Sequence, residues 1–222
     1  MKKKIKCILF DLDGTLINSG PDLLEALNHT LIKNNLQKIN SSYLGNLVGG
    51  GAAAMLERGY KFFNKTIESD ELPLLVKQFL DFYYKNCSVK TKPYKGVLKT
   101  LENLSLNNYT LAVCTNKSQR LADKVLKELK LEKFFKLILG SSEKLKLKPD
   151  SEMLDFSLKY LNFFPEESIM VGDSSNDILP SNLLKINSIF VKYGYGDCLN
   201  LKPTFKIESI SEILECIKKL NN

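Results

Sequence analysis

Five short apolar runs, separated by longer amphipathic segments, constrain the fold of this chain more than any other feature of its sequence. Continuous apolar runs of this length are typical of parallel strands that are buried on both faces of a sheet. The runs span residues 5–10, 109–114, 137–139, 168–171 and 188–191. Helical spacing of apolar residues occupies residues 118–129, 151–161, 177–184 and 209–220. This alternation predicts an α/β fold with a doubly wound parallel sheet.

Residues 17–92 interrupt the alternation. They carry helical patterns over residues 21–34, 50–63 and 70–86, without a convincing strand between them. Pro21 suits the first turn of a helix, and Pro93 suits the linker by which the chain returns to the sheet. We therefore predict an α/β core formed by residues 1–16 and 93–222, with an all-helical insertion at residues 17–92.

The composition excludes several classes of protein. The formal charge of +7 comes from lysines spread among acidic residues along the whole chain, so no basic block indicates a nucleic-acid-binding surface. The five scattered cysteines form no CxxC pair, which argues against a disulfide framework or a zinc site. No apolar stretch approaches the roughly 18 residues of a membrane span, and Asp11 ends the first apolar run too early for a signal peptide. We expect a cytoplasmic protein, either a monomer or a homodimer, without nucleic-acid or membrane partners.

Two carboxylates stand directly after the first predicted strand, in Asp11-Leu12-Asp13-Gly14. Ligands of open α/β sheets bind at the carboxyl ends of strands. Two acids at such a point are costly unless a cation or a proton neutralises them, and Gly14 lets the chain turn so that both can face one cavity. Asp11 and Asp13 therefore indicate a site for a hard metal ion.

A second acidic loop, with Asp173 and Asp177, follows the predicted strand at residues 168–171. Two such loops on one edge of a sheet can converge, so Asp173 is the natural Mg²⁺ ligand beside Asp11, and the backbone carbonyl of Asp13 offers another oxygen. Asp177 either ligates the ion or stabilises the positive end of the following helix. The residue pattern leaves both possibilities open.

Three further polar residues are predicted to bind phosphate. Thr115 and Asn116 follow the strand at residues 109–114 and precede a helix, an arrangement that holds phosphate in many proteins. Among the alternating lysines at residues 143–148, Lys148 is selected by the proline after it, which precedes the start of a helix. Its ammonium group could neutralise both the phosphate and Asp11.

In order and context, the residues Asp11, Asp13, Thr115, Lys148, Asp173 and Asp177 resemble the four motifs of the haloacid-dehalogenase-like phosphatase superfamily. The resemblance spans almost the whole chain. Residues 10–16, the stretch Val48-Gly49-Gly50-Gly51-Ala52 and Tyr193-Gly194-Tyr195-Gly196 further resemble bacterial phosphoglycolate phosphatases. The resemblance implies a Rossmann-like core with an inserted α-helical cap. It also implies a Mg²⁺-dependent phosphatase that cleaves a small phosphorylated substrate, foremost 2-phosphoglycolate.

The resemblance implies a role for each residue. Asp11 would form an aspartyl-phosphate, and Asp13 would protonate the leaving oxygen and then activate water. Thr115 and Lys148 would bind the phosphoryl oxygens, and Asp173 would complete the metal site. For the carboxylate of phosphoglycolate, Arg58 and the glycines around Gly50 in the insertion are the candidates.

Three alternatives stay open beside this function, and a fourth, a dehalogenase, is disfavoured. The same motifs serve phosphosugar mutases such as β-phosphoglucomutase, and they serve other small-molecule phosphatases of the superfamily. The Asp11–Asp13 pair argues against a dehalogenase, which needs neither Asp13 nor Mg²⁺. A non-catalytic binding module on the same fold is the most remote alternative.

Overall fold

The computed structural model describes residues 3–222, and the chain divides into two compact units. The α/β unit contains the chain up to Asn18 together with Pro93–Asn222, and the helical unit contains Ser19–Lys92. At the two points where the chain passes from one unit to the other, β2 (Ile17–Asn18) pairs with β3 (Lys92–Pro93). The helical unit begins two residues after the start predicted for the insertion, and both end at Lys92.

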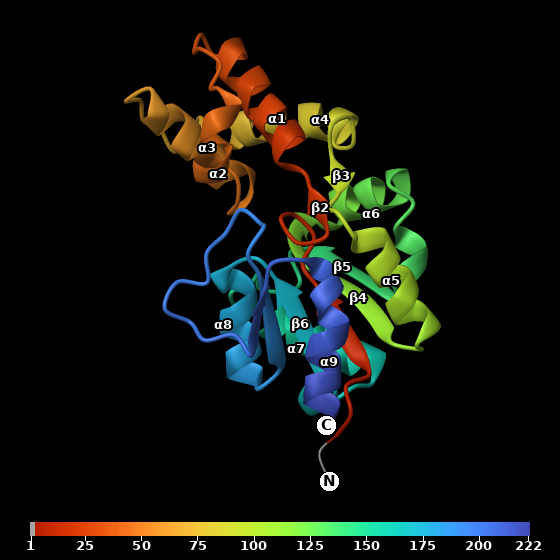
Figure 1. Ribbon diagram of the computed structural model, residues 1–222. Coiled ribbons are helices and arrows are strands. Elements are labelled where there is room, and N and C mark those ends of the chain that lie inside the picture. Colours follow the sequence, from red (N-terminus) through yellow and green to blue (C-terminus); the bar gives the residue numbers. More distant parts are fainter. Residues whose placement is uncertain (1–2) are drawn as a thin grey trace. The chain divides into compact units, whose positions relative to one another are not determined.

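A six-stranded parallel sheet forms the centre of the α/β unit (Figure 1). In spatial order the strands are β5 (Leu137–Ser141), β4 (Thr110–Ser118), β1 (Cys7–Phe10), β6 (Ser168–Gly172), β7 (Asn187–Val191) and β8 (Phe205–Ile207). The chain builds outward from β1 to β5 on one side and from β6 to β8 on the other. Ligands bind where the direction of winding reverses, so the loops after β1, β4 and β6 are the expected site. The predicted doubly wound parallel sheet is confirmed.

The central position of β1 explains its uninterrupted apolar sequence. All four residues of β1 are completely buried. Cys7 and Leu9 share a core cluster with Met153 and Leu154 of the helix α7 (Glu152–Leu161). The alternation of side chains along a strand directs Ile8 and Phe10 to the opposite face. Burial on both faces leaves no position in β1 for a polar residue, and the first acid of the chain, Asp11, comes directly after the strand.

Helices cover both faces of the sheet. They are α5 (Val97–Leu106), α6 (Gln119–Glu128), α7 (Glu152–Leu161), α8 (Ser175–Leu184) and α9 (Ile213–Asn221). In Figure 1, α5 and α9 lie in front of the sheet and α7 lies behind it. Short 3₁₀ helices in this unit span Glu132–Phe134, Pro165–Glu167 and Ile210–Glu212.

The helical unit consists of α1 (Gly20–Lys33), a 3₁₀ turn at Ser41–Tyr43, α2 (Leu44–Leu47), α3 (Gly51–Phe62) and α4 (Leu72–Asn86). One buried carboxylate organises its ends. Asp22, in the first turn of α1, accepts hydrogen bonds of 2.7–3.0 Å from the backbone N–H groups of Lys90 and Thr91 and from the Thr91 hydroxyl. The first and last segments of the unit are therefore fastened to each other.

Some local predictions were incomplete or wrong. The helix α5 and the edge strand β8 were not predicted. Thr115 and Asn116 do not directly precede a helix, because β4 continues with an irregularity from Cys114 to Ser118. The helix predicted at residues 177–184 starts at Ser175, so Pro180 lies in the second turn of α8, where it has no N–H to donate.

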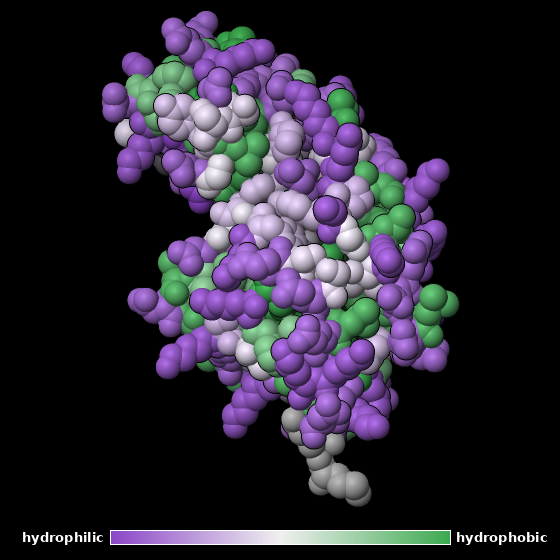
Figure 2. All heavy atoms as spheres, in the orientation of Figure 1, coloured by the Kyte–Doolittle hydropathy of each residue, from purple (hydrophilic) through white to green (hydrophobic). Residues whose placement is uncertain are grey.

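On the face drawn in Figure 2, hydrophilic residues cover most of the surface and hydrophobic residues gather in separate groups. None of the helices found between residues 3 and 222 combines the length and the apolar character that crossing a bilayer requires.

Candidate active site

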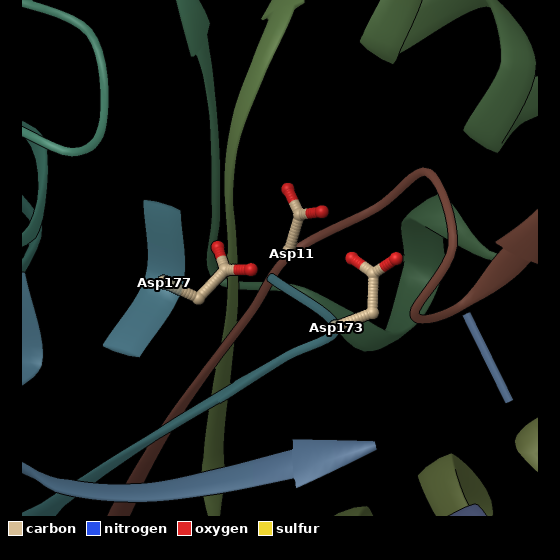
Figure 3. A group of neighbouring side chains, drawn as sticks. All are labelled: Asp11, Asp173 and Asp177. Carbon is tan, nitrogen blue, oxygen red and sulfur yellow. The ribbon is translucent and has the colours of Figure 1, made fainter. Parts of the chain in front are cut away.

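Three aspartates from separate elements meet at the carboxyl edge of the sheet (Figure 3). Asp11 follows β1, Asp173 follows β6 and Asp177 lies in the first turn of α8. Each is buried, and each offers a carboxylate oxygen within 4.8 Å of the others. The predicted convergence of the two acidic loops therefore occurs, and it includes Asp177, whose role the sequence left open.

Glycines make room for these carboxylates. A Cβ atom on Gly172 would lie 2.2 Å from Cγ of Asp177, and one on Gly194 would lie 2.2 Å from Cβ of Asp173. Gly14 has a φ of +89°, and its Cβ would lie 2.3 Å from Oδ2 of Asp173. Any larger residue at these positions would displace an acid, so the glycines belong to the construction of the site.

Lys148 joins two of the aspartates. Its Nζ donates to Oδ1 of Asp11 at 2.9 Å and to Oδ1 of Asp177 at 2.6 Å, and the side chain is 2% exposed. The amide of Asn116 fixes the backbone around this lysine: Nδ2 donates to the Lys148 carbonyl at 2.6 Å, and Oδ1 accepts from the Lys148 N–H at 2.9 Å. The side chain of Asn116, a predicted substrate contact, thus holds the backbone of Lys148 in place.

Donors from the neighbouring loops fix the second oxygens of Asp173 and Asp177. Oδ2 of Asp173 accepts from the N–H groups of Tyr195 at 2.7 Å and Gly196 at 3.0 Å. Oδ2 of Asp177 accepts from the N–H and the hydroxyl of Ser174, which caps α8. Asp177 thus caps its helix and belongs to the acidic cluster at the same time. The loop at residues 193–196 was noted in the sequence for its resemblance alone, and its contact with Asp173 was not predicted.

Burial and repulsion between carboxylates raise the pKa values of Asp11 and Asp173. Burial raises the pKa of Asp11 to about 6; Lys148 opposes this shift, and Asp177 adds to it. Burial also raises the pKa of Asp173 to about 7, with further contributions from Asp11 and Asp177. For Lys148, burial alone would lower the pKa, but the two carboxylates that it contacts outweigh burial and hold the pKa above its ordinary value.

The donor set of the cluster fits a hard divalent cation. Three ionised carboxylates face the single ammonium group of Lys148, so two negative charges remain, which is the charge that one Mg²⁺ ion neutralises. All the candidate ligand atoms are carboxylate oxygens, which Mg²⁺ prefers. Like charges buried together are costly without such a counterion, and their repulsion adds to the effect of burial on the pKa values of Asp11 and Asp173.

A second buried ion pair lies beside this cluster. Nζ of Lys117 donates to Oδ1 and Oδ2 of Asp13 at 3.0 and 2.9 Å. The side chain of Lys117 is 4% exposed, whereas that of Asp13 is 22% exposed. Thr115, two residues earlier on β4, is buried, and its hydroxyl accepts from the N–H of Lys117. Sequence reasoning missed Lys117, because lysine is so common in this chain that one more carried no signal.

The two site residues predicted in the insertion lie together in the helical unit. Arg58, on α3, donates from Nη1 to the carbonyls of Leu47 and Gly49, both at 2.8 Å. Gly50 has a φ of +75° and precedes the first turn of α3. The guanidinium group therefore holds the glycine loop at the start of this helix.

The comparisons with known proteins agree with this architecture. The model of the haloacid dehalogenase-like hydrolase family matches residues 8–191. A phosphoglycolate phosphatase of Agrobacterium fabrum is 34% identical over 207 residues, which cover 92% of this chain and 89% of the relative. An N-acetylmuramic acid 6-phosphate phosphatase of Pseudomonas putida is 29% identical, with 86% and 85% of the two chains covered.

A solved structure extends the likeness to three dimensions. The crystal structure of a predicted phosphoglycolate phosphatase from Haemophilus somnus superimposes with a TM-score of 0.87 at 29% identity, covering 96% of this chain and 97% of the other. The family model spans the strands from β1 to β7 and reaches all three aspartates of the cluster. The chain therefore belongs to the haloacid dehalogenase-like hydrolase family.

Proposed function

We propose that this hydrolase is a Mg²⁺-dependent phosphatase that converts 2-phosphoglycolate to glycolate and phosphate. The buried cluster of Asp11, Asp173 and Asp177 around Lys148 is the observation that carries the proposal, because it combines a carboxylate nucleophile with the donor set of a hard cation. The name of the Agrobacterium relative supports the choice of substrate.

Asp11 acts as the nucleophile. Lys148 holds Oδ1 of Asp11, which leaves Oδ2 to attack the phosphorus and form an aspartyl-phosphate. The hydroxyl of Thr115 and the ammonium group of Lys148 bind phosphoryl oxygens, and Asn116 acts through Lys148, whose backbone it clamps. A buried ammonium group loses little energy to reorientation when charge develops on the transferring group.

Asp13 acts as the acid and then as the base. It protonates the leaving oxygen in the first step and removes a proton from water in the second. Carboxylates of Asp11, Asp173 and Asp177, with the backbone carbonyl of Asp13, are the candidate ligands of Mg²⁺. When bound, this ion would offset negative charge on the phosphoryl group.

The two units divide the work. The α/β unit is the catalytic core, and the helical unit is a cap that selects the substrate. Gly50 and Arg58 are the proposed contacts of the cap with the part of the substrate beyond the phosphate. We also propose that the enzyme acts in the cytoplasm, on a small soluble substrate.

A phosphate-release screen tests the function. The purified protein is given Mg²⁺ and a panel that includes 2-phosphoglycolate, N-acetylmuramic acid 6-phosphate and β-glucose 1-phosphate. We expect the highest kcat/KM with 2-phosphoglycolate, and we expect a metal chelator to abolish turnover. Phosphate release from another ester alone would replace 2-phosphoglycolate as the proposed substrate. Turnover that survives chelation would contradict the metal assignment.

The same screen separates the alternatives. A mutase would interconvert sugar phosphates without releasing phosphate, which analysis of the sugar products detects. A binding module would release nothing from any ester. Either result would overturn the proposed phosphatase.

A further inference from the structure

Lys117 is the second buried lysine of the site, and its charge has no part in the mechanism above. Among residues 3–222, the buried lysines are Lys117 and Lys148. A buried ammonium group is expensive unless it is paired, and both lysines are paired with aspartates at the carboxyl edge of the sheet. The two cations thus occupy different parts of one site.

The partners of the two lysines define these parts. Lys148 contacts the nucleophile Asp11, so it lies on the side of the phosphoryl group. Lys117 contacts both carboxylate oxygens of Asp13, the residue that meets the leaving oxygen in the proposed mechanism. Lys117 therefore lies on the side of the leaving group.

We infer that Lys117 recognises a carboxylate carried by the leaving group, and so selects 2-phosphoglycolate over esters that lack this charge. The inference rests on the proposed function. In 2-phosphoglycolate the carboxylate is attached to the same methylene carbon as the ester oxygen. A leaving oxygen in contact with Asp13 brings that carboxylate into the immediate neighbourhood of the ammonium group that Asp13 holds.

Charge and position favour this role. With a divalent cation bound, the acidic cluster and Lys148 together would carry no net charge, and the Asp13–Lys117 pair carries none either. A substrate with an additional carboxylate therefore needs a cation in reach of its leaving group. Burial makes an ammonium–carboxylate contact stronger than it would be in water. The side chain of Asp13 is partly exposed while that of Lys117 is buried, so a carboxylate that lies beside Asp13 would meet the ammonium group where little water screens the contact.

Lys117 would add to the substrate contacts proposed for Arg58 in the helical unit, and the two cations are held in different ways. Nη1 of Arg58 already donates to two carbonyls of the helical unit, whose loop it organises. Lys117 is instead fixed by its position on β4, two residues after Thr115, in the element that also carries the proposed phosphate contact.

The test compares two substrates that differ in this one group. Ethyl phosphate carries a methyl group where 2-phosphoglycolate carries the carboxylate. We expect Lys117→Met to lower kcat/KM for 2-phosphoglycolate by about 10- to 100-fold more than for ethyl phosphate, the loss expected for one hydrogen bond to a charged group. Lys117→Arg should restore part of the preference. Lys146→Met, which changes a lysine with a 75% exposed side chain, is the matched control and should leave the preference unchanged.

Two results would overturn the inference that Lys117 recognises the carboxylate. An equal loss on both substrates means that Lys117 only positions Asp13. A parent enzyme that hydrolyses both esters with equal kcat/KM has no carboxylate recognition to lose. Failure of the parent enzyme on every ester in the screen instead contradicts the proposed function itself. Circular dichroism of each variant verifies folding, and if Lys117→Met does not fold, the same comparison is made with Lys117→Gln, which removes the charge but keeps a donor to Asp13.

Discussion

At the scale of single residues, two lysines hold three of the four acids of the site, and backbone N–H groups hold the fourth, Asp173. Lys148 holds Asp11 and Asp177, and Lys117 holds Asp13. Each acid is therefore fixed before any substrate binds, and such preorganisation is what makes electrostatic stabilisation effective. The sequence identified Lys148 through the proline after it, but it offered no comparable mark for Lys117.

Asp11→Asn should abolish turnover while leaving the fold intact. The amide keeps the shape of the side chain but removes the nucleophilic oxygen, so we expect kcat to fall by at least about 10³-fold. Phosphate release from 2-phosphoglycolate measures the loss. Asp81→Asn, on the exposed face of α4, is the control and should be fully active. Normal activity of Asp11→Asn would exclude the aspartyl-phosphate mechanism.

Gly194→Ala should weaken metal binding without contacting the metal. The new methyl group would collide with Cβ of Asp173, so this carboxylate must move. We expect the affinity for Mg²⁺, measured by titration calorimetry, to fall by about 10-fold or more. Gly45→Ala is the matched change, because a Cβ at Gly45 has no neighbour within 4 Å. Equal affinities in the two variants would show that Asp173 does not depend on the loop.

At the scale of secondary-structure elements, the central strands were the easiest to predict. Burial on both faces made β1 apolar throughout and gave β6 and β7 the apolar runs at residues 169–171 and 189–191, and the acids follow β1 and β6 directly. Edge strand β8 has three residues, too few to show a period. The helix α5 carries apolar residues at helical spacing, namely Val97, Leu101 and Leu104, but it lies directly after the return linker and was not predicted.

Contacts made across the sheet could not be predicted from local sequence. The clamp of Asn116 on Lys148 joins residues 32 positions apart, and the contact of Lys117 with Asp13 joins residues 104 apart. Motif spacing predicts which loops meet at the edge of the sheet, because strand order determines that. It does not predict which side chains pair there, because side-chain pairing depends on the irregular backbone of β4 after Cys114.

The Asp22 clamp should be important for the stability of the helical unit. Asp22→Ala would leave the buried N–H of Thr91 and its hydroxyl without their acceptor, at a cost of about 2–3 kcal/mol in the free energy of unfolding. Urea denaturation followed by circular dichroism measures this cost. Asp81→Ala removes a carboxylate from an exposed pair on α4 and should cost less than about 0.5 kcal/mol. Similar losses of unfolding free energy in both variants would mean that the hydrogen bonds of Asp22 stabilise the protein no more than an exposed ion pair does.

At the scale of the whole molecule, the uncompensated charge of the acidic cluster affects stability. Without metal, burial raises the pKa of Asp173 to about 7, from an ordinary value of 3.8. Between these values the folded protein binds more protons than the unfolded chain, so the contribution of Asp173 is favourable at low pH and is lost as the pH rises toward 7.

Asp173→Asn should therefore stabilise the metal-free protein at high pH. The amide oxygen can still accept from Tyr195 and Gly196, but it carries no charge. The gain in unfolding free energy over the parent protein should be larger at pH 8 than at pH 5, by about 2 kcal/mol. Saturating Mg²⁺ should stabilise the parent and not the variant. A gain that is the same at both pH values would contradict the raised pKa.

The order of the strands also has a consequence for synthesis on the ribosome. The strand β1, which Asp11 follows, lies in the middle of the finished sheet, yet Lys148, the partner of Asp11, is translated 137 residues after it and Asp173 later still. The helical unit, by contrast, is one continuous stretch of chain, and its first and last segments are fastened by Asp22. The helical unit can thus be synthesised completely before the strands that pair with β1 have been translated. The carboxylates that repel one another come together only when most of the sheet is present to hold them.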